Sequence, residues 1–131
     1  MIRILYVEDN EDNIYMLSRR LKRKSFEVFI AKDGRSGVDM AISKKPDIIL
    51  MDLSLPIMDG WQATHLIKQN PDTQHIPIIA LSAHAMDQHK SDALAAGAED
   101  FDSKPVDLAR LLNKMESLLP QLILSKQGDC K

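Results

Sequence analysis

Acidic residues crowd the point where the first apolar segment of the chain ends. Residues Ile2 to Val7 are long enough for one buried strand, and Glu8 and Asp9 follow directly. Asp52 lies inside another such segment, Asp47 to Leu53, and its apolar neighbours predict that its carboxylate is buried. A buried carboxylate is costly unless it is paired or binds a metal. If these two segments are adjacent strands, three carboxylates converge and supply the hard oxygen ligands that suit Mg²⁺.

Ser82 and Lys104 place two more polar groups at the ends of later segments. Ser82 follows the apolar residues Ile78 to Leu81, and Lys104 lies two residues beyond Asp102. A metal site, a hydroxyl donor and a fixed cation on one rim indicate a site for a phosphoryl group, where charge stabilisation is the main catalytic contribution. Asp52 is the candidate nucleophile, because a carboxylate can form an acyl phosphate. A passive metal site is the alternative that spacing alone leaves open.

The acids that come next along the chain, Glu11 and Asp12, have a simpler explanation. Negative charge is favourable near the N-terminus of a helix, and a helical spacing of apolar residues begins at Ile14. We expect these two acids to be helix-start charges with no part in the site.

Short apolar segments alternate with segments of helical spacing along the whole chain. The expected strands are Ile2 to Val7, Phe26 to Ala31, Asp47 to Leu53, Ile76 to Ser82 and Glu99 to Asp102. The clearest helical stripe runs from Leu108 to Leu119, and Pro120 ends it. Five strands that alternate with five helices indicate βαβ units, whose right-handed crossovers build a parallel sheet between two helix layers. The sequence therefore predicts an α/β, doubly wound domain with its function at the carboxyl ends of the strands.

Length and composition allow one folded unit. The 131 residues carry 17 basic and 19 acidic side chains, and a net charge of −2 gives no global reason to bind DNA or an anionic membrane. No apolar stretch reaches the ~20 residues of a membrane span, and the N-terminus lacks the order of a signal peptide. The single cysteine, Cys130, agrees with a reducing compartment, so we expect a cytoplasmic protein. Residues 1–120 form the expected domain, and residues 121–131 form a C-terminal tail.

Four ordered motifs resemble one known family. They are ILYVEDN, IILMDLSLPIMDGW, PIIALSAHAM and GAEDFDSKP, which contain in turn the acidic pair, Asp52, Ser82 and Lys104. Over residues 2–119 the chain is similar to the receiver domains of two-component response regulators, particularly single-domain regulators of the chemotaxis type and receivers fused to hybrid histidine kinases. The resemblance implies a five-stranded sheet with the flavodoxin-like strand order 2-1-3-4-5.

The resemblance also implies a metal-binding role for four residues. Asp9 is the direct Mg²⁺ ligand, and Glu8 reaches the metal through water. Ser54 contributes its backbone carbonyl, and Asp52 is both a ligand and the phosphorylated residue. The same set of ligands is open to Mn²⁺.

Three further residues have implied roles in phosphate binding and switching. Lys104 binds the phosphoryl group, Ser82 turns its hydroxyl toward that group, and Phe101 is the aromatic residue that follows inward. The family also has a cis peptide bond where this chain has Lys104 and Pro105.

Three positions depart from the commonest pattern of the family. Glu8 stands in place of an aspartate, Ser82 in place of a threonine, and Phe101 in place of a tyrosine. All three are conservative in chemistry, although Phe101 gives up a hydroxyl that could bond to a partner.

The implied function is a phosphorelay signalling module that is not an enzyme acting on other molecules. The phosphodonor is the phosphohistidine of a histidine kinase or of a histidine phosphotransfer protein. Phosphorylation changes the surface and signals to a downstream protein that the sequence does not name, with no direct DNA binding and no membrane contact.

Two other classes of function compete with this interpretation. An aspartyl-phosphate phosphatase needs a second acid two residues after its nucleophile, and Ser54 stands at that position. A receiver-like module that binds partners without phosphate usually loses a site residue, and none is missing here. The initial Met1 and the short tail favour a stand-alone regulator over a receiver excised from a larger protein such as a hybrid histidine kinase.

Some features have ordinary and functional explanations side by side. The basic residues Arg19 to Lys24 are expected to be a solvated helix end, which is favoured over a nucleic-acid patch. His84 either overlooks the site together with Ser54 or is an exposed histidine with no such role. Residues Leu122 to Leu124 either pack on the domain or contact a partner.

Overall fold

Strands and helices alternate strictly in the part of the chain that the computed structural model describes, residues 1–83 and 87–119. The elements are β1 (Arg3–Val7), α1 (Glu11–Arg23), β2 (Glu27–Ala31), α2 (Gly34–Lys44), β3 (Ile48–Asp52), α3 (Gly60–Gln69), β4 (Ile78–Ser82), α4 (Asp87–Ala96), β5 (Asp100–Ser103) and α5 (Leu108–Leu118). All neighbouring strands are parallel, in the order β2-β1-β3-β4-β5. The fold class and the strand order expected from the sequence are confirmed.

The strands begin and end within one or two residues of the segments expected from the sequence. The largest difference is in β4, which starts at Ile78 and not at Ile76. Pro77 lies between them and has no backbone N–H to donate to a ladder, which explains the later start. Ile76 is nevertheless buried, because its side chain packs in the hydrophobic core next to the start of β4.

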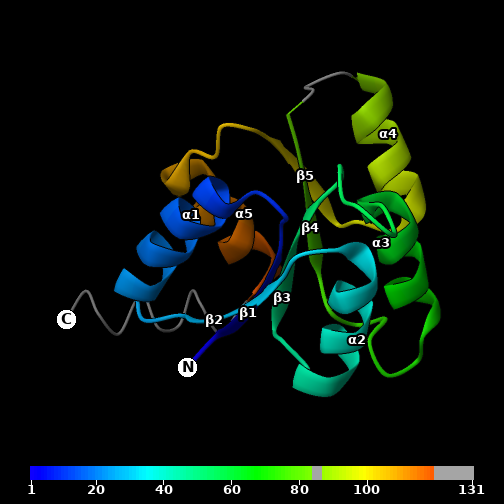
Figure 1. Ribbon diagram of the computed structural model, residues 1–131, viewed down its shortest axis with the longest axis horizontal. Coiled ribbons are helices and arrows are strands. Elements are labelled where there is room, and N and C mark those ends of the chain that lie inside the picture. Colours follow the sequence, from blue (N-terminus) through cyan, green and yellow to red (C-terminus); the bar gives the residue numbers. More distant parts are fainter. Residues whose placement is uncertain (84–86, 120–131) are drawn as a thin grey trace.

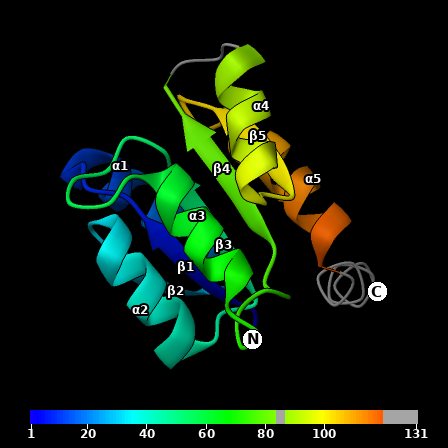
Figure 2. The same ribbon diagram turned by 90° about the vertical axis from the view of Figure 1, so that its right-hand side faces the viewer.

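Two separate cores lie on the two faces of the sheet. Figure 1 shows α1 and α5 on one side of the strands and α2, α3 and α4 on the other, and Figure 2 shows α2 and α3 in front of the sheet. Side chains of β1 alternate between these faces, as the geometry of a strand requires. Leu5 packs in the core under α2, α3 and α4, whereas Ile4 packs in the core under α1 and α5. The five residues of β3 are all buried, as expected for a central strand of a parallel sheet.

Short acidic or amide side chains start four of the helices. Each accepts a hydrogen bond from the backbone N–H three residues further on, and they are Asn10, Asp33, Asp59 and Asp107. Glu11 and Asp12 occupy the first turn of α1, which confirms them as helix-start charges. These caps fix the residue at which each of the four helices begins.

Two expectations from the sequence lie outside the described residues. These are the position of His84 and the packing of the tail, residues 121–131. Within residues 1–83 and 87–119, no helix combines the length and the apolar character needed to cross a membrane.

Candidate functional site

The carboxyl ends of β1 and β3 bring three acids together. Val7 lies opposite Met51 in the sheet, so Glu8 and Asp52 are the next residues of two neighbouring strands. Glu8, Asp9 and Asp52 each offer a carboxylate oxygen, and these oxygens all lie within 4.8 Å of one another. Glu8 and Asp52 are buried, whereas Asp9 is exposed. The convergence expected from adjacent strands is therefore observed.

Lys104 joins this cluster from the loop after β5. Its Nζ lies 2.6 Å from Glu8 Oε1 and 3.1 Å from Asp52 Oδ1. Its backbone N–H donates to the carbonyl of Ser82 at 2.7 Å, which ties the start of the loop to the end of β4. One ammonium group is thus shared by two buried carboxylates.

Glu8 is held by several donors besides Lys104. The Tyr6 hydroxyl donates to Oε1 at 3.3 Å, and the Asn13 side-chain amide donates to the same oxygen at 3.4 Å. The Asn10 backbone N–H donates to Oε2 at 3.2 Å. Because glutamate is one methylene longer than aspartate, Glu8 reaches back to Lys104 directly while its second oxygen remains bonded to the backbone.

Burial and crowding shift the pKa values of these groups in different directions. Burial, and then the charge of Glu8, raise the pKa of Asp52 to about 6. Burial alone would also raise the pKa of Glu8, but hydrogen bonds with Lys104 and Asp52 lower it. Burial disfavours the charged Lys104, yet its bond with Glu8 and the charge of Asp52 raise its pKa. In the absence of metal, Glu8 is therefore the firmer partner of Lys104, and Asp52 keeps a proton more readily.

The donor set fits a hard divalent cation. Three carboxylates against one ammonium group leave a surplus of negative charge within 4.8 Å, and carboxylate oxygens are the ligands that Mg²⁺ and Mn²⁺ take from proteins. The exposed Asp9 leaves one side open to the water molecules that Mg²⁺ retains.

The loop after Asp52 turns tightly into α3. The Ser54 backbone N–H donates to Asp52 Oδ1 at 3.4 Å, and the Gly60 N–H donates to the Leu53 carbonyl at 3.1 Å. A side chain at Gly60 would overlap the backbone carbonyl of Asp52, so this close approach requires glycine. Ser54 itself is exposed, next to the cluster.

Ser82 and Phe101 lie on the neighbouring strands β4 and β5. Asp52 is opposite Leu81, so Ser82 is one residue beyond the level of Asp52, and it is buried. Phe101 is 8% exposed and packs in the core of α2, α3 and α4. The peptide bond between Lys104 and Pro105 is cis, as the family resemblance implied.

Sequence reasoning missed Tyr6 and the pair of Asp102 and Arg110. Tyr6 lies two residues before Glu8, and side chains at positions i and i+2 of an extended chain point to the same face of the sheet. The contact between Tyr6 and Glu8 could therefore have been predicted from their spacing. The sequence assigned Asp102 no role beyond the end of the last strand. In the structure its buried Oδ1 lies 2.7 Å from Arg110 Nε. A 96-residue separation hides the bond between Lys104 and Glu8 from any local pattern.

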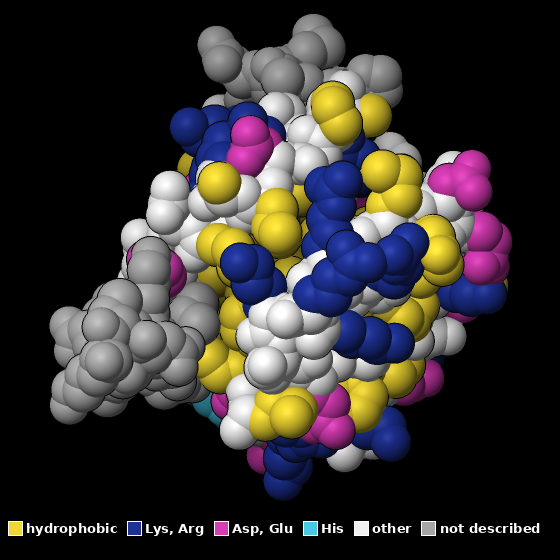
Figure 3. All heavy atoms as spheres, turned by 90° about the vertical axis from the view of Figure 1, so that its left-hand side faces the viewer, with side chains coloured by type: hydrophobic (Ala, Val, Ile, Leu, Met, Phe, Trp, Pro, Cys, Tyr) yellow, Lys and Arg dark blue, Asp and Glu magenta, His cyan; other side chains and the backbone are white. Residues whose placement is uncertain are grey.

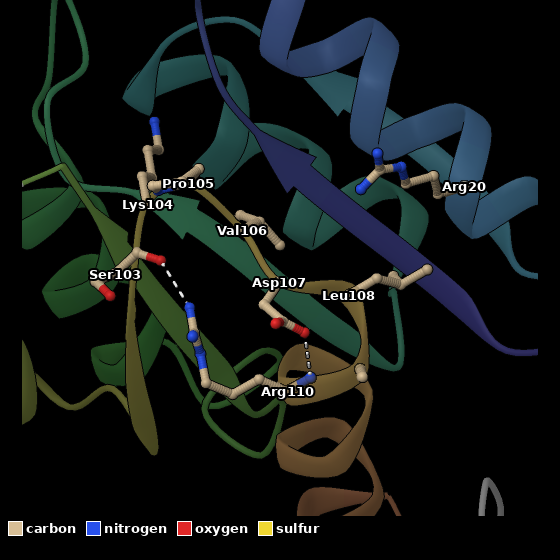
Figure 4. A pocket seen from close by; sticks show the side chains of 9 residues that line it. Arg20, Ser103, Lys104, Pro105, Val106, Asp107, Leu108 and Arg110 are labelled. Atoms are coloured by element: carbon tan, nitrogen blue, oxygen red, sulfur yellow. Dashed lines mark hydrogen bonds between the residues drawn. The ribbon is translucent and has the colours of Figure 1, made fainter.

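A pocket of about 690 Å³ lies beside the loop that carries Lys104. Figure 4 shows Arg20 of α1 on one side of it and, on the other, the segment from Ser103 at the end of β5 to Arg110 in the first turn of α5. The last turn of α1 also contains Lys22 and Arg23. Figure 3 shows Lys and Arg side chains gathered on the face of the molecule that carries α1. Cations are favourable at the C-terminus of a helix, which accounts for this part of the surface.

Comparison with known proteins gives a family for this arrangement. The model of the response regulator receiver domain matches residues 4–116. The chain is 34% identical to the protein PilH of Pseudomonas aeruginosa over 119 residues, which cover 91% of the chain and 98% of PilH. It is 38% identical to the response regulator PleD of Caulobacter vibrioides over 116 residues, but spans only 26% of the length of PleD.

A solved structure agrees with the sequence matches. The receiver domain of a sensor histidine kinase from Pseudomonas aeruginosa superposes with a TM-score of 0.84 at 34% identity, covering 89% of this chain and 96% of that domain. That domain has a magnesium ion coordinated in its active-site cleft. The chain belongs to the family of response regulator receiver domains of two-component signalling.

Proposed function

We propose that Asp52 accepts a phosphoryl group, with Mg²⁺ bound, from the phosphohistidine of a histidine kinase or a histidine phosphotransfer protein. The observation that carries this proposal is the 3.1 Å distance between Asp52 Oδ1 and Lys104 Nζ within the cluster of three acids. A buried nucleophile beside a fixed cation and a set of metal ligands is suited to charge stabilisation during phosphoryl transfer. Membership of the receiver family supports the same reaction.

The proposed transfer balances with the groups present. An oxygen of the ionised Asp52 carboxylate forms a bond to phosphorus while the phosphorus–nitrogen bond of the donor breaks, and the electron pair returns to the imidazole. Lys104 remains an ammonium group and neutralises charge on the phosphoryl oxygens. In the later hydrolysis, a water oxygen attacks phosphorus, the bond to Asp52 breaks, and inorganic phosphate leaves.

Four residues would hold the metal in this proposal. Asp9 and Asp52 would bind it directly, Ser54 would contribute its backbone carbonyl, and Glu8 would reach it through water. When bound, Mg²⁺ or Mn²⁺ neutralises the surplus negative charge and the charge of the phosphoryl group. The bond between Glu8 and Lys104 keeps the ammonium group beside Asp52 until the phosphoryl group is present.

Ser82 and Phe101 are the proposed switch residues. A phosphoryl group brings a charge of about −1.5 to −2 and three acceptor oxygens, which the Ser82 hydroxyl meets by turning toward Asp52. The Phe101 ring is buried in the structure, and we expect phosphorylation to raise the population of this inward position. The surface of α4, β5 and α5 then carries the signal.

The setting of the reaction is also part of the proposal. Residues 1–120 act as the receiver domain and residues 121–131 as its tail, in the cytoplasm. The output is a contact with another protein or an onward relay of phosphate, without direct DNA binding. The domain changes only its own phosphorylation state and does not act as an enzyme on other molecules.

Intact mass measurement tests the proposal directly. With Mg²⁺ and acetyl phosphate we expect one added phosphoryl group on the protein, and no addition in Asp52→Asn. Absence of any adduct, from acetyl phosphate and from a phosphohistidine donor alike, would show that Asp52 is not a phosphoacceptor. An adduct that persists in Asp52→Asn would place the modification elsewhere.

A further inference from the structure

Among the strands of residues 1–83 and 87–119, β5 is the last of the sheet and has a neighbouring strand on one side only. β4 pairs with it from Asp100 to Ser103. Lys104 donates its backbone N–H to the carbonyl of Ser82, so alternation along a parallel ladder turns the carbonyl of Ser103 away from β4. The end of β5, where Lys104 follows, therefore lacks the second ladder that supports the central strands.

Arg110, in the first turn of α5, binds this free edge. Its Nε donates to Asp102 Oδ1 at 2.7 Å, and its Nη2 donates to the carbonyl of Ser103 at 3.3 Å. Its backbone N–H donates at 3.0 Å to Asp107, the residue that caps the helix. Figure 4 shows Arg110 bonded both to Ser103, before the loop, and to Asp107, at its end. One residue thus closes the loop that starts at Lys104.

Asp102 depends on this contact. Its side chain is 3% exposed, and Oδ1 also accepts the Ser103 backbone N–H at 2.8 Å. Within residues 1–83 and 87–119, Oδ2 has no hydrogen-bond partner. A buried carboxylate that keeps one cationic partner loses most of its compensation when that partner is removed. Asp102 and Arg110 are therefore a mutually dependent pair at the root of the loop.

The loop in question presents the ammonium group of the candidate site. Lys104 Nζ contacts Glu8 and Asp52 from the first residue after β5. A shift of about 1 Å in a group that must meet the reacting atoms can cost about a hundredfold in rate. We infer that Asp102 and Arg110 form a positioning pair, which fixes the loop after β5 so that Lys104 meets a phosphoryl group on Asp52. The role of Lys104 in this inference rests on the proposed function.

The first experiment measures the loop without any phosphoryl transfer. In Arg110→Met we expect the backbone amide of Lys104 to exchange with deuterium about tenfold faster, relative to the amides of β3, because its bond to Ser82 opens when the loop loosens. Asp102→Asn keeps the shape of the side chain and removes its charge, so it should give the same increase. Unchanged exchange in both variants overturns the inference.

Lys68→Met is the matched control for this measurement. Lys68 Nζ pairs with Glu99 Oε2 at 2.7 Å, and Glu99 precedes β5 at the opposite end of the strand. The control removes an ion pair of similar length from the same edge of the sheet but leaves the loop intact. Its relative exchange at Lys104 should equal that of the wild type, and an equal increase in the control overturns the inference.

The second experiment measures the rate constant of phosphorylation by acetyl phosphate at saturating Mg²⁺. We expect Arg110→Met to lower it about tenfold, and to change the residual rate of Lys104→Met by less than about twofold, because the effect acts through Lys104. The same loss in both backgrounds indicates a purely structural role and overturns the inference. If the wild type takes up no phosphoryl group, the proposed function fails, and the exchange experiment still decides whether Arg110 fixes Lys104.

Discussion

Two lysines at opposite ends of the sheet each form an ion pair, but the number of carboxylates around them differs. Lys68 Nζ pairs with one carboxylate, Glu99, at 2.7 Å, and donates to the carbonyls of Ile76 and Gln74 at 2.6 and 3.2 Å. The other oxygen of Glu99 accepts the Ile78 backbone N–H at 2.7 Å. At this amino end of the strands, Lys68 has one counter-charge, Glu99, and both oxygens of Glu99 are bonded.

Lys104, at the carboxyl end, has no such balance. It contacts both Glu8 and Asp52, and Asp9 lies within reach of the same oxygens. Two buried carboxylates share one cation, and the pKa of Asp52 is raised, first by burial and then by the charge of Glu8. Lys68 and Glu99 thus form a balanced ion pair at the edge of the sheet, which indicates a structural role. The surplus of carboxylates around Lys104 indicates a site suited to a cation.

The largest expected effect comes from removing the exposed acid of the unbalanced cluster. Asp9→Ala should abolish Mg²⁺-dependent phosphorylation, because Asp9 is the acid with an open side toward the metal. Incorporation of phosphate from acetyl phosphate, followed by intact mass, measures the effect. Asp12→Ala, in the first turn of α1, is the control and should keep the wild-type rate. Equal losses in both variants would show that the acids act only through net charge.

The two lysines should separate in a measurement of stability. Lys68→Met leaves Glu99 and two carbonyls without their donor, and we expect a loss of about 1–2 kcal/mol in the free energy of unfolding, mostly from the part-buried carbonyl of Ile76. Lys104→Met should also destabilise the metal-free protein, because Glu8 and Asp52 then lose the ammonium group that they share. Mg²⁺ should reduce the difference in stability between Lys104→Met and the wild type, and should leave the difference between Lys68→Met and the wild type unchanged. Urea unfolding of all three proteins with and without the metal measures both differences.

Metal removal tests the same comparison in the wild-type protein. A ligand that binds only the folded state stabilises it by about 2.7 kcal/mol when its free concentration is about 100 times Kd. We expect Mg²⁺ to raise the unfolding temperature of the wild type accordingly, and EDTA to reverse the shift. Asp9→Ala should show no shift. An identical shift in that variant would place the metal elsewhere on the molecule.

Most of the fold and the centre of the site follow from local sequence patterns, and the supporting contacts do not. Glu8, Asp52 and Lys104 could be predicted, because each lies near the end of an expected strand and the topology of parallel strands brings these ends to one edge of the sheet. The bond of Asp102 to Arg110 depends on the rotamer of one long side chain and on the position of α5, which no periodicity encodes. Motifs identify the reacting groups, whereas the groups that place them require three-dimensional contacts.

The pH dependence of stability tests the imbalance at Asp52 in the metal-free protein. Its pKa is raised from 3.8 to about 6, so the folded state keeps a proton that the unfolded chain loses between these values. The contribution of Asp52 to stability is therefore fully present below the unfolded pKa and is lost as pH rises through about 6. Asp52→Asn has no such loss, and should gain about 2 kcal/mol relative to the wild type between about pH 4 and about pH 7. Urea unfolding in EDTA across this range measures the difference, and a constant difference would mean that Asp52 is not strained by its neighbours.

The smallest expected effect on stability comes from removing the hydroxyl of Tyr6, which donates a hydrogen bond to Glu8. Burial, and then Glu8, raise the pKa of its hydroxyl, so it remains a donor to Glu8 Oε1, at 3.3 Å. Tyr6→Phe removes this donor, but Lys104 and the Asn10 backbone N–H still hold Glu8. We expect a loss of about 0.5–1 kcal/mol in the free energy of unfolding without metal, since one long hydrogen bond to a charged group is removed. Chemical denaturation measures it, and a loss as large as that of Lys68→Met would mean that Tyr6 is a principal support of Glu8.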